Sequence, residues 1–170
     1  MKKVTVLSRI RAKELSFKEI PECIIISINT NGVKNFFAKN NNIKDILFLT
    51  FDDVEKDEGI EKCMTESQAM QVVAFINKWD NIDNIIVHCD AGISRSSGVG
   101  AAILKAKNGD DSEIFDNGNF CPNMKCFRLV LEAFFIDIDE KEIEEKIDRN
   151  LKAWKKLQFD EVWNSLDHTI

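Results

Sequence analysis

The twelve residues at positions 87–98, V-H-C-D-A-G-I-S-R-S-S-G, hold one of the chain's two histidines together with a cysteine, two glycines, an arginine and three serines. The apolar run Ile85–Val87 leads into this stretch, and a helical pattern follows it from Ser97 to Lys107. A strand, a glycine-containing loop and a helix in succession leave unpaired backbone N–H groups at the helix start, where an anion can bind. We therefore predict that this loop binds a phosphate group.

Two side chains of the loop can act chemically on a bound phosphate. The helix start and the charge of Arg95 would both favour the thiolate of Cys89 over its thiol. The guanidinium of Arg95 can donate to two phosphate oxygens, and Gly92 lets the backbone turn tightly so that its amides converge. Ser96 could donate a hydrogen bond to the departing sulfur, and His88 would fix the loop. The expected substrate-binding positions are Asp90, Ala91, Gly92, Ile93, Ser94 and Arg95.

The C-x5-R spacing alone is a weak signal, because a buried strand-end thiol and a solvated arginine would look the same. The full segment H-C-D-A-G-I-S-R-S, residues 88–96, resembles the H-C-x-x-G-x-x-R-S/T motif of the cysteine-dependent protein tyrosine phosphatase superfamily and is most similar to its dual-specificity group. The resemblance is dense over residues 87–98, and the order of elements agrees with it from about residue 20 to 136. It implies a protein-tyrosine-phosphatase-like fold and hydrolysis through a phosphocysteine, with no metal or organic cofactor.

The resemblance also implies an aspartic acid upstream of the cysteine, which protonates the leaving oxygen of the phosphate ester. Phe51-Asp52-Asp53 lies in the expected window and resembles the W-P-D tripeptide of the tyrosine-specific members. This alignment makes Asp53 the catalytic acid. Asp52 stays an alternative, because the proline that would fix the alignment is missing, and a solvated acidic loop is the alternative to both.

The expected activity is hydrolysis of phosphomonoesters, with phosphotyrosine in proteins as the first substrate class and phosphoserine or phosphothreonine as further ones. Asp90, Ala91 and Ile93 add no positive charge to the loop, so a heavily charged substrate is disfavoured. A small phosphomonoester is a further possible substrate. The alternative function is a pseudophosphatase, a module that binds a phosphopeptide without turning it over.

The hydrophobic pattern predicts strands that alternate with helices, which is typical of an α/β domain with a mostly parallel sheet flanked by helices. Strands are expected at residues 4–7, 23–28, 46–51 and 85–87, and helices at residues 65–79, 97–107, 122–135 and 139–158. A capping box, Thr65-x-x-Gln68, opens the first of these helices, which would bury Met70, Val73, Ala74 and Ile76.

The whole chain, residues 1–170, is expected to form one phosphatase-like domain with a C-terminal helical extension at residues 139–170. The last helix carries an apolar stripe that would dock onto the domain, with a dimer or partner surface as the alternative; it is formed by Ile143, Ile147, Leu151, Trp154 and Leu157.

The net charge of −6 disfavours nucleic acid and anionic membranes as partners, and no apolar run is long enough to span a bilayer. The five cysteines are odd in number and irregularly spaced, which fits reduced thiols in the cytoplasm better than a disulfide framework. Cys121 and Cys126 lack the matching pairs that a zinc site needs, and we expect both to be core thiols. The sequence leaves the oligomeric state open.

Overall fold

The computed structural model describes residues 1–30 and 37–166 of the chain, with side chains as far as residue 160. Four strands of this described part form one sheet in the order β1-β4-β2-β3, and all neighbouring strands run parallel. The predicted α/β class with a parallel sheet flanked by helices is therefore confirmed. The strands are β1 (Lys3–Ser8), β2 (Cys23–Asn29), β3 (Ile43–Thr50) and β4 (Asn84–Cys89).

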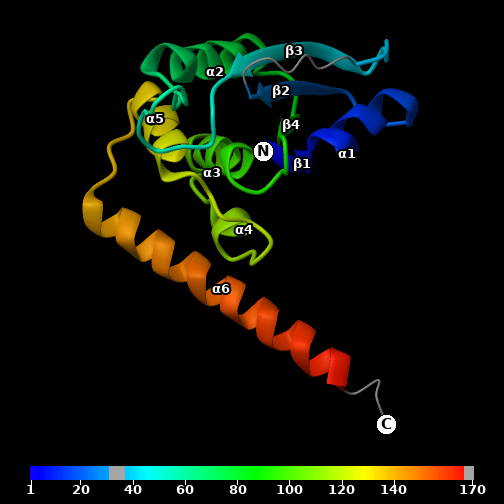
Figure 1. Cartoon of the computed structure of the whole chain (residues 1–170). Helices are drawn as coiled ribbons and strands as arrows, with labels where there is room; N and C mark the ends of the chain where they lie inside the picture. Colours follow the sequence, from blue (N-terminus) through cyan, green and yellow to red (C-terminus); the bar gives the residue numbers. More distant parts are fainter. Residues whose placement is uncertain (31–36, 167–170) are drawn as a thin grey trace.

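The two faces of the sheet are covered unequally. On one face, residues such as Ile26 and Val87 pack in the main core against three helices, which Figure 1 shows gathered on one side of the sheet. On the other face, Ile25 and Ile86 belong to a smaller cluster to which Leu15 contributes. The three core helices are α2 (Glu66–Lys78), α3 (Arg95–Asn108) and α5 (Met124–Ala133), and the second face carries α1 (Arg9–Glu14) and the 3-10 turn η1 (Leu15–Phe17).

Helix α2 begins at the predicted capping box, since the backbone N–H of Gln68 donates to Thr65 Oγ1 and the backbone N–H of Thr65 donates to Gln68 Oε1. Of the predicted buried stripe of this helix, Ile76 is buried as expected, whereas Met70 is 59% exposed, Ala74 is exposed and Val73 is half-buried. The buried side chains besides Ile76 are Ala69, Val72 and Phe75. Both sets have helical spacing, so spacing alone could not choose between them; the observed face buries the large ring of Phe75 as well.

Helix α3 begins at Arg95, two residues earlier than predicted, and its small residues allow close packing. A Cβ atom on Gly98 would lie 2.4 Å from the carbonyl oxygen of Asn123, the residue that caps α5. A larger residue at position 98 would therefore push the start of α5 away from α3. This contact positions Asn123, the residue that caps α5.

The last helix, α6 (Glu140–Leu166), is longer than predicted; residues 167–170 of the predicted extension lie outside the described residues. A buried ion pair holds α6 to the domain: Lys146 Nζ lies 2.9 and 2.6 Å from the two carboxylate oxygens of Asp111, which precedes α4 (Ser112–Phe115). The same ammonium lies 5.0 Å from the ring centre of Phe115 and 5.5 Å from that of Phe127. The helix therefore docks partly through a buried charge, which the apolar pattern did not indicate.

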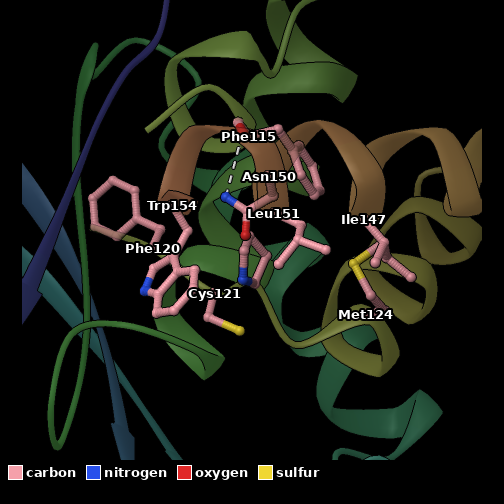
Figure 2. Close-up of a pocket in the computed structure, with 9 residues that line it drawn as sticks. Phe115, Phe120, Cys121, Met124, Ile147, Asn150, Leu151 and Trp154 are labelled. Atoms are coloured by element: carbon pink, nitrogen blue, oxygen red, sulfur yellow. Dashed lines mark hydrogen bonds between the residues drawn. The ribbon is translucent and has the colours of Figure 1, made fainter. Parts of the chain in front are cut away.

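The predicted apolar stripe of α6 is only partly buried. Ile143 is in the core, whereas Ile147, Leu151 and Trp154 are 47%, 44% and 47% exposed. Figure 2 shows these three side chains lining a hydrophobic pocket whose opposite side is formed by residues of the 115–124 segment. Cys121 lies in this lining and is exposed, so it is not the core thiol that we expected, whereas Cys126 is buried.

None of the helices in the described part of the chain has the length and apolar character that a membrane crossing requires.

Candidate active site

The candidate site forms at the carboxyl end of β4, where Cys89 is the last residue of the strand. Its side chain is buried, and its sulfur lies 3.1 Å from Ser96 Oγ and accepts a hydrogen bond from the Gly92 N–H at 3.3 Å. Burial raises the pKa of the Cys89 thiol, but hydrogen bonds from Ser96 and Gly92 and the charge of Arg95 outweigh it, and the pKa lies below its usual value. The surroundings therefore favour a thiolate.

The loop backbone is turned so that its N–H groups can face the sulfur. The carbonyl oxygen of Asp90 accepts from the Arg9 N–H at 3.2 Å, that of Ile93 from the Cys121 N–H at 3.0 Å, and that of Ser94 from the Asn123 N–H at 3.1 Å. In a trans peptide the N–H points opposite to the C=O. Because segments outside the loop bind these carbonyls, the N–H groups that follow them point away from those segments, which an anion-binding loop requires.

Gly92 is required where the loop touches the end of β1. Its φ is +76°, and a Cβ atom there would lie 2.4 Å from the backbone nitrogen of Ser8 and 2.5 Å from the carbonyl carbon of Leu7. Strands β1 and β4 are paired with Ser8 opposite Cys89, so the turn after β1 lies directly against the loop. Only glycine combines this backbone angle with such a close approach.

Arg95, at the start of α3, is 4% exposed and held from two sides. Its Nη1 donates to the Phe51 carbonyl at 2.9 Å and to Thr30 Oγ1 at 3.2 Å, and its Nη2 donates to Asp90 Oδ2 at 2.8 Å. Within the described residues its Nε has no hydrogen-bond partner, and a carboxylate oxygen of Asp53 is 3.9 Å away. The guanidinium is thus anchored by both Nη1 and Nη2, while its Nε–H is left without a partner among the described residues and could donate to a phosphate oxygen.

Asp53, and not Asp52, has its carboxylate against the loop. Asp53 Oδ1 accepts from Ser94 Oγ at 2.8 Å and from Asn123 Nδ2 at 3.1 Å. The Asp52 carboxylate accepts instead from the backbone N–H of Lys62 at 2.9 Å, within its own loop. Of the two sequence candidates for the acid, the structure brings only Asp53 into contact with the Cys89 loop.

His88 lies beneath the loop and is fully buried. Its Nε2 is 2.9 Å from Ser27 Oγ, and its Nδ1 is 3.4 Å from the Cys89 carbonyl oxygen. Burial is the main reason that its pKa falls from 6.5 to about 4, with the charges of Arg9 and Lys13 acting in the same direction. This position fits the predicted role of fixing the loop.

The pKa of His88 predicts a loss of stability in mild acid. In the folded protein the His88 imidazole stays neutral down to about pH 4, whereas in the unfolded chain it takes up a proton below pH 6.5. The free energy of unfolding therefore falls as the pH drops from 6.5 to about 4. We expect the unfolding free energy to fall by about 2–3 kcal/mol more in the wild type than in His88→Gln between pH 7 and pH 4.5. Urea unfolding at both pH values measures this difference. An equal pH dependence in the two proteins would contradict it.

Three residues of the site were not among those predicted. Thr30, just after β2, accepts from Arg95 and donates to Asp90 Oδ2 at 2.6 Å. Asn123 caps α5 and also donates to Asp53, and Arg9 forms an ion pair with Asp90. Thr30 was detectable in principle, since it follows a buried strand at the edge where parallel strands end.

Among the described residues, no cluster of three or more acidic, histidine or cysteine side chains could hold a metal ion.

Comparison with known proteins gives structural neighbours only. No family model matches the sequence, and no curated protein matches it. The chain is similar to the crystal structure of PTPMT1, with 18% identity over 88% of this chain and 94% of that one and a TM-score of 0.46. It is also similar to the PTP-2 phosphatase of Cydia pomonella, with 15% identity over 78% and 86% of the two chains and a TM-score of 0.49. OH1, a tyrosine phosphatase of the Orf virus, matches with 15% identity over 90% and 80% and a TM-score of 0.40.

Proposed function

We propose that the chain is a cysteine-dependent phosphatase that hydrolyses phosphomonoesters, with phosphotyrosine in proteins as its main substrate and phosphoserine or phosphothreonine as further ones. The observation that carries the proposal is the position of the Cys89 sulfur. It lies within a loop that supplies hydrogen bonds from Ser96 and Gly92 and that also contacts Asp53. Five free cysteines, all within the described residues, fit a reducing compartment, and we place the activity in the cytoplasm.

In the first step the Cys89 thiolate attacks phosphorus in line with the leaving oxygen, the S–P bond forms and the P–O ester bond breaks. Asp53, protonated, gives its proton to the leaving oxygen. The Arg95 Nε–H and the N–H groups of the loop bind the equatorial oxygens, over which the transition-state charge is spread. The product alcohol or phenol leaves, and a phosphocysteine remains.

In the second step water attacks the phosphocysteine. Asp53, now a carboxylate, accepts a proton from the water, and the S–P bond breaks to release inorganic phosphate and the Cys89 thiolate. The Ser96 hydroxyl, 3.1 Å from the sulfur, can donate a hydrogen bond to the charge that develops there. This contact makes sulfur a better leaving group.

The second candidate function is phosphopeptide binding without turnover. The contact that favours it is the double hydrogen bond on Asp53 Oδ1, because Ser94 and Asn123 both donate to this oxygen and so engage it within the site. The two functions differ in whether product is released.

The test is release of p-nitrophenol from p-nitrophenyl phosphate by the wild-type protein in metal chelator, together with vanadate binding measured by calorimetry. Turnover in chelator, inhibited by vanadate, supports the phosphatase. Vanadate binding with no turnover on this ester or on a phosphotyrosine peptide would establish the binding module instead. A protein that neither binds vanadate nor releases product would contradict both.

A further inference from the structure

Arg9 is brought beside the Cys89 loop by the register of the sheet. Because Ser8 of β1 is paired with Cys89 of β4, the residues that follow them, Arg9 and Asp90, emerge side by side. The Arg9 N–H donates to the Asp90 carbonyl oxygen at 3.2 Å, and the Arg9 guanidinium forms an ion pair with Asp90 Oδ1. Their side chains are 24% and 33% exposed, so the pair is partly open to solvent although Asp90 Oδ1 itself is buried, and we call this pair the rim of the site.

The Asp90 carboxylate connects this rim to the anion-binding arginine. Its Oδ2 accepts from Arg95 Nη2 at 2.8 Å and from Thr30 Oγ1 at 2.6 Å. One carboxylate thus lies between two guanidinium groups, and the three charges sum to +1. Without Asp90 the same place would carry +2, and the Arg9 side chain would lose the ion pair that holds it.

We infer that Asp90 is a specificity-determining residue that keeps Arg9 from binding the ligand and so favours substrates with a single phosphate over those with neighbouring anionic groups. This inference rests on the proposed phosphate site. Arg9 has the complementary role: it neutralises Asp90, whose charge would otherwise repel the incoming phosphate.

The effect of a fixed charge on binding grows with the charge of the ligand. A carboxylate at the rim repels a polyphosphate more strongly than orthophosphate, and a released arginine attracts it more strongly. Replacing Asp90 by Asn keeps an oxygen that can accept from Arg95, and Arg95 Nη1 stays anchored on the Phe51 carbonyl. The substitution therefore changes charge with little change of shape.

The experiment measures binding of orthophosphate and of tripolyphosphate to the Cys89→Ser protein by calorimetry, in chelator, so that no turnover is needed. With Asp90→Asn we expect the preference for tripolyphosphate over orthophosphate to rise about tenfold. With Arg9→Gln we expect it to fall by about fivefold, and the double variant should return close to the starting preference because the two charges cancel. Asp83→Asn is the matched control, since Asp83 precedes β4 at the end of the strand opposite Cys89 and should leave the preference unchanged.

An unchanged preference in Asp90→Asn, with orthophosphate still bound, would overturn the inference and leave the proposed function intact. If Asp90→Asn does not fold, a preference that Arg9→Gln leaves unchanged would overturn the inference equally. If the Cys89→Ser protein binds neither anion, the phosphate site itself is contradicted, and the proposed function and this inference both fail.

Discussion

Replacing Cys89 by Ser should lower kcat on p-nitrophenyl phosphate by about a thousandfold or more, because the substitution removes the nucleophilic sulfur while the side chain keeps nearly the same shape. The structure stabilises a thiolate through Ser96, Gly92 and Arg95, and the pKa of Cys89 is lowered accordingly. A serine hydroxyl in the same place stays protonated, and no base lies within hydrogen-bond reach in the described residues: its neighbours are Ser96 Oγ and the Gly92 N–H. Steady-state kinetics in chelator measure the loss.

Cys121→Ser is the matched control, because it makes the same chemical change in an exposed cysteine on the pocket beside α6. Its turnover should stay within about twofold of the wild type. Alkylation by iodoacetamide gives an independent reading of the thiolate, and Cys89 should be the thiol that reacts fastest at neutral pH. Turnover that survives in Cys89→Ser would contradict the phosphocysteine mechanism.

The sequence was informative where a local pattern carries the physical constraint. The strands, the loop at 87–98 and the capping box at Thr65 each depend on neighbouring residues, and each is present in the structure. Asp53 could be preferred to Asp52 only through a resemblance, since both follow the same strand. The choice between their two orientations is made by Ser94 and Asn123, which are 41 and 70 residues away in the chain.

The residues that the sequence did not indicate owe their place to contacts distant along the chain. Arg9 reaches Asp90 because β1 pairs with β4, and the sequence does not reveal the order of strands in the sheet. Lys146 interrupts the apolar pattern of α6, yet it is buried because Asp111 and two phenylalanine rings surround it. Apolar periodicity cannot predict a buried lysine, because it counts each charged residue as part of the solvated face.

Asp53→Asn should lower kcat on a phosphotyrosine peptide by about a hundredfold, because the amide cannot give a proton to the leaving phenol. The amide can still occupy the position beside Ser94 and Asn123, so the loop should keep its shape and vanadate should bind about as before. The loss should be smaller on p-nitrophenyl phosphate, since p-nitrophenolate leaves more readily without a proton. This dependence on the leaving group distinguishes a lost acid from a distorted loop, which would lower both rates equally.

Asp52→Asn is the control for this experiment, because it removes the same charge from the adjacent residue. Asp52 accepts from the backbone N–H of Lys62, a bond that the Asn side-chain oxygen can also accept, so kcat should change by less than about threefold. The reverse result, a large loss in Asp52→Asn and none in Asp53→Asn, would assign the acid to Asp52. Its loop would then have to change conformation during the reaction so that the Asp52 carboxyl faces the phosphate. Equal small losses in both variants would instead mean that neither carboxyl protonates the leaving group.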